Sequence, residues 1–425
     1  MGKPHHFLVN VDLPVFCLAF TPDNKLVVGG GGGPGRSGVN NKLVLYNIDA
    51  PKETAAEYAS RLLSNEEDAP MCLSVHPEEL IFACGINSQE KAIQAGDNKN
   101  LRMFKYGDNL IEPVKSVQTI ESRQPIDYQK VARFSRDGKY LVTGTTDGRL
   151  TVLRYPSFKA AFPPINLDKK EVLDADVDAA SDRIVAVTAK ILRLMAVKDG
   201  RVLQTIDNPT LNKKTTCEFR ACRWVDSGAG GQRDGFAAYG RDYYYHRIFE
   251  DMDAMPITTS FFPLLPSTPI TPPQLRRRQN LRLPLHRRQS DVANAWVYLQ
   301  VACRHVAESQ ERGREQEADH GVHDQGHLLA YASSDLVIGI ADADNLRPLF
   351  QIKNAHGFSI TCLAFNRDDR ILVSGSVDSR CRVVDLPAKL EKESFSPFLA
   401  VFIALIIAVI GYLLSSGFYD FPSHG

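Results

Sequence analysis

The stretch Ile360–Asp385 (ITCLAFNRDDRILVSGSVDSRCRVVD) carries the pattern that decides the fold of this chain. It contains three short apolar runs, separated by the polar turns 366–369 and 377–379. Short runs rich in β-branched and small residues, bounded by turn residues, are typical of β-strands. The stretch therefore predicts three consecutive strands that pair antiparallel through tight turns.

The same unit recurs along the chain. Clear copies cover 15–48 and 131–153, weaker copies begin near Met71, Leu173 and Arg220, and a partial copy covers Leu328–Asp342. Their spacing of about 42 to 59 residues is typical of propeller blades with loop insertions. The gap between Arg220 and Thr361 leaves room for one further blade, so the sequence predicts an all-β, seven-bladed WD-type β-propeller.

Two features are expected to complete this propeller. The segment His6–Pro14 is predicted to supply the outer strand of the last blade and close the ring, because closure hides the sheet edges. Polar residues in the strand turns are predicted to lock the blade geometry by hydrogen bonds; they are Asp147, Asp335, Asp378 and His356.

The C-terminal region contains an uncharged apolar run, 398–414 (FLAVFIALIIAVIGYLL), from Phe398 through Ile406 to Leu414. As a helix, 17 residues at 1.5 Å each span about 26 Å, close to a thin bilayer. A buried core helix is the alternative. Lys389 and Lys392 precede the run and no Lys or Arg follows it, which favours a cytosolic N-terminal part. We expect a propeller over 1–386, a linker over 387–397, a transmembrane helix over 398–414 and a short lumenal tail over 415–425.

The repeat pattern is lost in the stretch 241–327. This stretch is rich in proline at 263–273, basic at 276–278 and 287–288, and polar and aperiodic at 308–327. It is either a disordered insertion between blades, an error in the gene model, or a basic motif for nuclear import or nucleic acid. A metal site has no ligand spacing to support it, although four histidines occur here: His305, His320, His323 and His327.

Composition excludes several classes of function. The 425 residues carry 50 basic and 50 acidic side chains, so no general attraction to nucleic acid follows. The eight cysteines form no CxxC pair, and several lie in apolar runs, which favours buried, reduced thiols. No nucleophile–base set or metal cluster can be assembled from the readable motifs, so we expect no catalytic residues and no enzyme.

A glycine-rich stretch, 29–41 (GGGGGPGRSGVNN), has seven glycines in thirteen residues. The pattern does not support a Rossmann site, because a strand, not a helix, is expected after the loop, and it does not support a P-loop, because no Gly-Lys-Ser/Thr follows. The stretch is either a flexible excursion inside a hairpin or a loop whose exposed backbone holds an ion or reaches into a partner. Asparagine at its exit adds a side-chain oxygen suited to a hard cation.

With the propeller and the apolar C-terminal run, this loop resembles one known family. Four glycines (30–33), four spacers and Gly38-Val39-Asn40-Asn41 are similar to the potassium-binding loop of the endoplasmic-reticulum WD-repeat exchange factors for the Sar-type GTPase, the prolactin regulatory element-binding protein family. The resemblance covers roughly 1–240 and 328–414. The stretch 241–327 departs from it, where the family has the rest of blade five and the first strand of blade six.

The resemblance implies a function and a site. It implies a guanine-nucleotide exchange factor at the endoplasmic reticulum membrane that loads GTP on the Sar-type GTPase and starts COPII coat assembly and ER-to-Golgi transport. The GTPase-contacting loop would comprise Gly30, Gly31, Gly32, Gly33, Arg36, Ser37, Gly38, Val39 and Asn40. A potassium ion would be held at Gly38 and Asn41, and Val39 would be the apolar tip that displaces a GTPase element.

Two other functions are considered. A tail-anchored WD-repeat scaffold would gather proteins without altering nucleotide state, and it would not require the glycine loop. A transcription regulator is suggested by the basic run, but the predicted anchor argues against it.

Overall fold

The computed structural model describes residues 4–35, 37–207, 218–224, 328–341, 348–368 and 370–387 with their side chains, and the backbone of short strands between 210 and 342. Gly2–Pro387 form one compact unit, and residues 388–425 lie outside the described residues. The predicted anchor residues Phe398, Ile406 and Leu414 therefore lie outside them too. Within the described part, no helix is long and apolar enough to cross a membrane.

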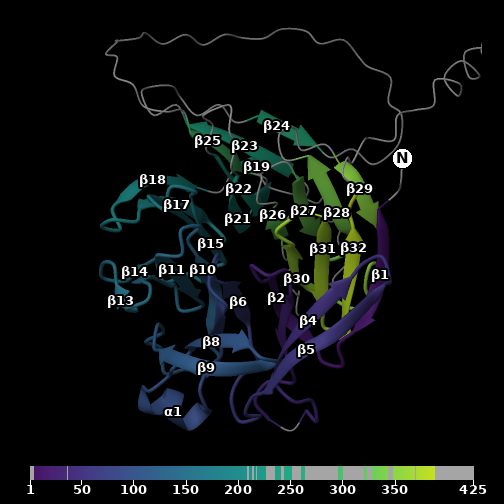
Figure 1. Ribbon diagram of the computed structural model, residues 1–425. Coiled ribbons are helices and arrows are strands. Elements are labelled where there is room, and N and C mark those ends of the chain that lie inside the picture. Colours follow the sequence, from purple (N-terminus) through teal and green to yellow (C-terminus); the bar gives the residue numbers. More distant parts are fainter. Residues whose placement is uncertain are drawn as a thin grey trace, which may run out of the picture. The chain divides into compact units, whose positions relative to one another are not determined.

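The first two blades are antiparallel meanders in which sequence order and spatial order agree (Figure 1). The first contains β2 (Val15–Phe20), β3 (Leu26–Gly30), β4 (Lys42–Asp49) and β5 (Thr54–Leu62). The second contains β6 (Cys72–Val75), β7 (Ile81–Gly85), β8 (Leu101–Gly107) and β9 (Leu110–Val117), with helix α1 (Glu90–Ala95) between β7 and β8.

Four more sheets are antiparallel and form blades. The third contains β10 (Gln129–Phe134), β11 (Tyr140–Thr145), β12 (Arg149–Arg154), β13 (Lys159–Ala160) and β14 (Ile165–Asn166). The fourth contains β15 (Asp174–Val177), β16 (Arg183–Val187), β17 (Ile191–Ala196) and β18 (Val202–Asp207). The others contain β26 (His320–Val322), β27 (Leu328–Ala332), β28 (Ile338–Asp342) and β29 (Pro348–Ile352), and β30 (Ile360–Phe365), β31 (Ile371–Ser376) and β32 (Arg380–Asp385) joined by β1 (His5–Asn10).

The prediction of seven regular blades is corrected to six. A short β19 (Thr210–Asn212) and β20 (Thr215–Thr216) form a two-stranded pair, and the next sheet has the irregular order β21-β22-β25-β23-β24. Its strands are β21 (Phe219–Val225), β22 (Gly235–Gly240), β23 (Tyr244–Glu250), β24 (Ser260–Pro263) and β25 (Ala295–Leu299). Because β25 is inserted between β22 and β23 and runs parallel to β22, this sheet is not a blade meander. The described strands within 241–327 therefore do not pair in the regular order of a blade.

The N-terminal strand β1 completes the last blade, as predicted from His6–Pro14. It pairs antiparallel with β32 from His5↔Asp385 to Asn10↔Arg380, and Figure 1 shows the two strands side by side. The side chain of Phe7 is buried in a cluster that also holds Val15 and Val383. The pairing thus covers the edge that β32 would otherwise expose.

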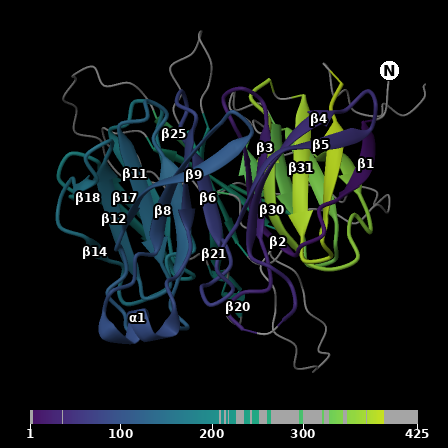
Figure 2. The same cartoon turned by 60° about the horizontal axis from the view of Figure 1, so that its bottom comes forward.

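The first strands of neighbouring sheets contact one another in sequence: β2 with β6, β6 with β10, β10 with β15, β15 with β21 and, through β26 and β30, back to β2. Figure 2 shows β2 and β3 next to β30 and β31. Apolar side chains fill the spaces between sheets; Leu43 of β4 and Phe82 of β7, for example, share one buried cluster. The sheets thus bury their faces against each other, as a propeller requires.

Cysteines pack against glycines at equivalent places in three blades. A Cβ added to Gly29, Gly85 or Gly375 would lie 2.7 Å from the thiol of, respectively, Cys17, Cys72 or Cys362. The six described cysteines are all free and buried, which confirms the prediction for them; Cys217 and Cys303 lie outside the described residues. Burial raises the pKa of the Cys72 thiol to about 12. The Cys72 thiol therefore stays protonated and serves packing.

Hydrogen bonds in the strand turns confirm the predicted locking role of three residues. His356 Nδ1 lies 3.1 Å from Asp378 Oδ2, and its Nε2 lies 2.8 Å from Ser374 Oγ. Asp378 also accepts the Gly357 N–H at 2.8 Å. In the third blade Asp147 accepts the hydroxyl of Thr145. Buried or half-buried polar side chains therefore hold these turns, and each of them has a hydrogen-bond partner.

Candidate functional site

The glycine-rich segment 29–41, here called the glycine loop, starts inside β3 and ends where β4 begins. The predicted context of strand, loop, strand is confirmed, because Gly30 pairs with Lys42 across the two strands. A Cβ on Gly30 would lie 1.9 Å from the carbonyl oxygen of Pro14, so no larger residue fits there. The N–H of Gly31 donates to that same carbonyl at 3.0 Å. The base of the loop is therefore fixed tightly against the chain that enters β2.

Asn41 is the residue that holds the loop together. Its side chain is fully buried, and its Oδ1 accepts the Gly33 N–H at 2.9 Å. Its Nδ2 donates to the carbonyls of Glu67 at 3.0 Å, Ser64 at 3.1 Å and Gly33 at 3.4 Å. Both ends of the amide are thus used, and they connect the glycine loop to the segment that follows β5.

That second segment, 63–68, forms further bonds with the loop. Asn65 accepts the Asn41 N–H through Oδ1 at 3.2 Å and donates from Nδ2 to Asn40 Oδ1 at 2.8 Å. Its carbonyl accepts the Gly35 N–H at 3.2 Å. Sequence reasoning did not single out Ser64, Asn65 or Glu67. The polar run Ser64–Asp68 (SNEED) after a strand was the available signal, because such residues favour turns with side-chain hydrogen bonds.

Two acidic side chains lie beside the loop. Glu67 forms a bidentate ion pair with Arg102 of β8, with both N···O distances at 2.7 Å and both side chains largely buried. Burial raises the pKa of the Asp68 carboxyl. One Asp68 oxygen would lie 3.7 Å from a Cβ on Gly33. The ion pair fixes the segment whose carbonyls bind Asn41, so it supports the loop indirectly.

The outer part of the loop is exposed. Gly35, Ser37, Gly38 and Asn40 face solvent, while Arg36 lies outside the described residues. Val39 is half-buried and packs against the core cluster of the first and last blades. Its N–H donates to Ser37 Oγ at 3.3 Å. Among the described loop residues, Val39 therefore lies against the core, while Gly35, Ser37, Gly38 and Asn40 face solvent.

The predicted potassium site would use the oxygen atoms around Asn41. Three backbone carbonyls, of Gly33, Ser64 and Glu67, converge on one point, and carbonyl oxygens are the donors that potassium filters use. In this structure the Asn41 Nδ2 lies at that point, and its N–H groups donate to the three carbonyl oxygens. A potassium ion would fit these oxygens only with the Asn41 amide turned so that Oδ1 joins them, which gives up the hydrogen bond that Oδ1 accepts from the Gly33 N–H. Gly38, the other predicted ligand, lies on the exposed side of the loop.

A groove lies next to this segment, between the outer strands of the first two blades. It has a volume of about 570 Å³ and is lined by parts of β5, β8, β9 and the segment 63–68, including Ser64 and Glu67. Leu62 and Val114 on its walls are 65% and 56% exposed, and Arg61, Lys99 and Lys115 add positive charge. The glycine loop thus has an apolar and basic surface at its side.

The fold defines the class of protein: the described sheets form a β-propeller. Residues 347–385, from the residue before β29 to the end of β32, match the family model "WD domain, G-beta repeat".

The chain is similar to named exchange factors of the SEC12 type. It is 25% identical over 216 residues to the guanine nucleotide-exchange factor SEC12 of Candida glabrata, covering 50% of this chain and 45% of that protein. It is 23% identical to the mouse guanine nucleotide-exchange factor SEC12, covering 97% and 98%, and 22% identical to the SEC12-like protein 2 of Arabidopsis thaliana, covering 84% and 75%. The chain thus spans about half the length of the yeast relative. These similarities confirm the predicted resemblance to the WD-repeat exchange factors.

Proposed function

We propose that this protein is a guanine-nucleotide exchange factor that loads GTP on a Sar-type small GTPase at the endoplasmic reticulum membrane, the step that starts COPII coat assembly. The observation that carries the proposal is the glycine loop, fixed by the buried Asn41 and exposed beyond it. The names of the similar proteins support it, since they are called guanine nucleotide-exchange factors. A scaffold without exchange activity is not favoured, because it does not require such a loop.

The proposed mechanism needs no covalent chemistry. An exchange factor accelerates GDP release by binding the opened, nucleotide-free GTPase more tightly than the GDP-bound form, which is differential binding between two states. A loop that stays in one conformation loses little entropy on binding, so more of its contact energy is available for this difference. The hydrogen bonds of Asn41 and Asn65 supply that fixed conformation.

The residues have separate proposed roles. The exposed residues Gly35, Ser37, Gly38 and Asn40 would contact the GTPase, with the glycines allowing close approach of the backbone. Val39 would provide the apolar contact next to them, and Leu62 and Val114 in the adjacent groove would extend the surface. A potassium ion, when bound, would supply a fixed positive charge that holds the carbonyls of Gly33, Ser64 and Glu67 together with Asn41.

We also propose that the run 398–414 anchors the protein in the membrane, with the propeller in the cytosol and the tail in the lumen. The charge asymmetry around the run supports this orientation. Confinement to one membrane would load the GTPase where its active form can insert an amphipathic helix.

Release of fluorescent GDP from a Sar-type GTPase tests the proposal. The full chain in detergent should raise the release rate in the presence of excess GTP, and Val39→Ala should lower that rate about tenfold, corresponding to about 1.4 kcal/mol of differential binding. Val202→Ala, an exposed valine on β18, is the matched control. Wild-type protein that leaves the release rate unchanged would favour the scaffold.

A further inference from the structure

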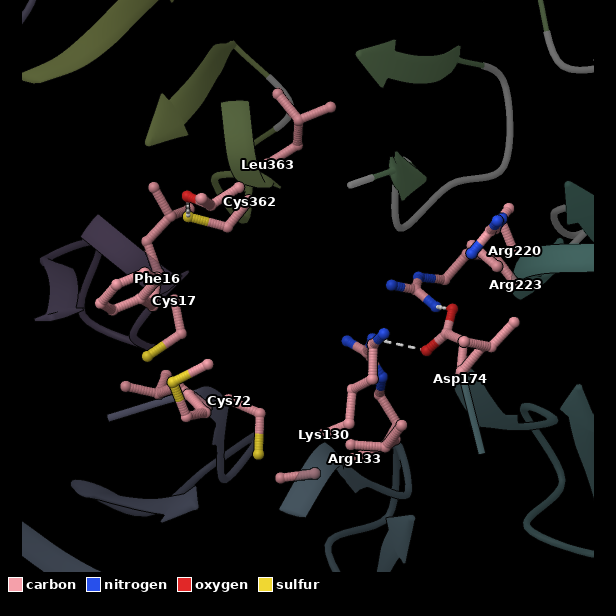
Figure 3. A pocket seen from close by; sticks show the side chains of 18 residues that line it. Phe16, Cys17, Cys72, Lys130, Arg133, Asp174, Arg220, Arg223, Cys362 and Leu363 are labelled. Atoms are coloured by element: carbon pink, nitrogen blue, oxygen red, sulfur yellow. Dashed lines mark hydrogen bonds and ion pairs between the residues drawn. The ribbon is translucent and has the colours of Figure 1, made fainter. Parts of the chain in front are cut away.

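A cavity of about 170 Å³ lies where the first strands of the sheets meet, away from the glycine loop. Figure 3 shows that its two sides differ. Cys17, Cys72 and Cys362 lie on one side, and Arg133, Arg223 and Asp174 lie on the other. Among the described lining residues, cations outnumber carboxylates, because Lys130 and Arg220 also border the cavity.

Arg133 stands at a position where two other blades, the first and the last, have alanine. The pairing of Val131 with Gly144 in the third blade corresponds to the pairing of Cys17 with Gly29 and of Cys362 with Gly375. By this register, Arg133 corresponds to Ala19 and Ala364. The propeller therefore does not need an arginine here for its fold.

The guanidinium of Arg133 has unmet hydrogen-bonding capacity. Its Nε is buried and has no hydrogen-bond partner among the described residues. Its nearest carboxylate oxygens, on Asp174 and Asp176, lie at 3.7 and 3.9 Å, beyond hydrogen-bond distance. A buried N–H without an acceptor destabilises the protein, so an acceptor from outside would be bound favourably.

The two aspartates are already engaged with the backbone. Asp174 accepts the N–H groups of Ala175 and Cys222 at 3.0 Å, and it also accepts from the Arg223 guanidinium. Asp176 accepts the Trp224 N–H at 2.9 Å. These bonds hold β21 against β15. The two carboxylates offset the charge of Arg133 without accepting a hydrogen bond from it.

The two other cations that line the cavity, Lys130 and Arg220, form ion pairs with partly exposed glutamates. Lys130 lies 3.0 Å from Glu171, and Arg220 lies 3.0 Å from Glu218. Both glutamates are 38% exposed, so water screens them more than it screens the cations that face inward. The inner face of the cavity is thus positive next to Arg133 and Arg223.

We propose that this cavity binds one small tetrahedral oxyanion, inorganic phosphate, between Arg133 and Arg223. Arginine's planar fork of donors matches phosphate oxygens, and such charge-assisted bonds are strong. The volume holds several water molecules and accommodates one phosphate, but it is too small for a polyphosphorylated inositol. The anion would connect β10, which carries Arg133, to β21, which carries Arg223, at the junction with the irregular sheet.

Thermal unfolding of the full chain in detergent tests the proposal. At constant ionic strength, replacing chloride by 10 mM inorganic phosphate should raise Tm by about 2 °C or more, because a ligand that binds only the folded state stabilises it. Equilibrium dialysis with radiolabelled phosphate should show one bound anion per chain. Arg133→Ala should fold, as alanine occupies this position in other blades, and should bind phosphate at least about tenfold more weakly.

Two further variants complete the design. Arg133→Lys keeps the charge but loses the fork, so its phosphate affinity should fall between those of the wild type and Arg133→Ala. Arg201→Ala changes an exposed arginine after β17 and should respond like the wild type. An equal phosphate effect in all variants, or no dialysable phosphate in the wild type, would overturn the proposal. Stabilisation by inositol hexakisphosphate without any by inorganic phosphate would overturn it as well.

Discussion

The Asn41 side chain binds the backbone of Gly33 at both of its polar groups: Oδ1 accepts the Gly33 N–H at 2.9 Å, and Nδ2 donates to the Gly33 carbonyl at 3.4 Å. Such a two-sided contact closes the glycine loop across eight residues. It also makes Asn41 a structural residue of the first blade, whether or not it binds an ion. Its removal should therefore affect the stability of the blade as well as any bound ion.

Asn41→Ala should destabilise the propeller by about 2 kcal/mol or more, because it leaves the Gly33 N–H and three carbonyls without their partner. This cost is larger than the roughly 0.5 kcal/mol of an ordinary surface substitution, because Asn41 is fully buried. Urea unfolding measures the change. Asn41→Asp separates the roles: if a cation is bound there, potassium should stabilise this variant more than sodium does, whereas equal effects would contradict the potassium site.

Val39→Ala should lower the exchange rate about tenfold while costing about 1 kcal/mol or less in stability, since Val39 is only half-buried. The measurement is release of fluorescent GDP, made with wild-type and variant protein at temperatures equally far below their Tm. An unchanged rate would mean that the glycine loop only connects β3 to β4 and does not act in nucleotide exchange.

Two glycines of the loop should respond differently to alanine. Gly30→Ala should cost about 3 kcal/mol, because the new Cβ would collide with the Pro14 carbonyl, which belongs to the backbone. Gly38 has open space around it but a φ of 79°, so Gly38→Ala should cost only about 1 kcal/mol. Urea unfolding of both variants, compared with wild type, checks the order; equal costs would contradict the close approach at Gly30.

The buried His356 should make the propeller sensitive to acid. Burial lowers its pKa below 6.5, although Asp378 acts in the opposite direction. Between the folded pKa and 6.5 the unfolded chain binds more protons, so stability is full above pH 6.5 and is lost as the pH falls through that window. Urea unfolding at pH 7.5 and 5.5 should show a larger loss in wild type than in His356→Gln.

A control is needed because burial also lowers the pKa of His6. His6→Gln should keep most of the acid-dependent loss, since His6 is more exposed than His356. If His6→Gln abolishes the loss and His356→Gln does not, the assignment to His356 is wrong.

Removal of residues 395–425 should release the protein from membranes and leave a soluble propeller, because the blades bury their apolar faces on each other. Fractionation of cells that express the truncated chain measures this. Membrane association that persists through carbonate extraction would contradict the anchor.

The regular blades could be predicted because each is encoded locally. Weak copies expected near Met71 and Leu173 begin within one residue of β6 and β15, since apolar runs and turns specify strands over short distances. The irregular sheet could not be predicted, because the parallel pairing of β22 with β25 joins segments far apart in the sequence.

The candidate site was predictable only in its chain position. The glycines and Asn41 are visible as a pattern, but the acceptors of the Asn41 amide on Ser64 and Glu67 lie 23 and 26 residues away. Nothing local distinguishes an asparagine that points to solvent from one that the next loop covers. Its burial follows from the way β5 returns beside β4.

The pairing of β1 with β32 also has a consequence for how the chain is made. His6 and Arg382, whose side chains meet at 3.0 Å, are separated by 376 residues. During synthesis the N-terminal strand therefore emerges long before its partner, and the ring can close only when the last blade has left the ribosome. Until then β1 and the first blade have an uncovered side, and a pairing of such long range is slow to form. The time between these two events is when a nascent chain would depend most on chaperones.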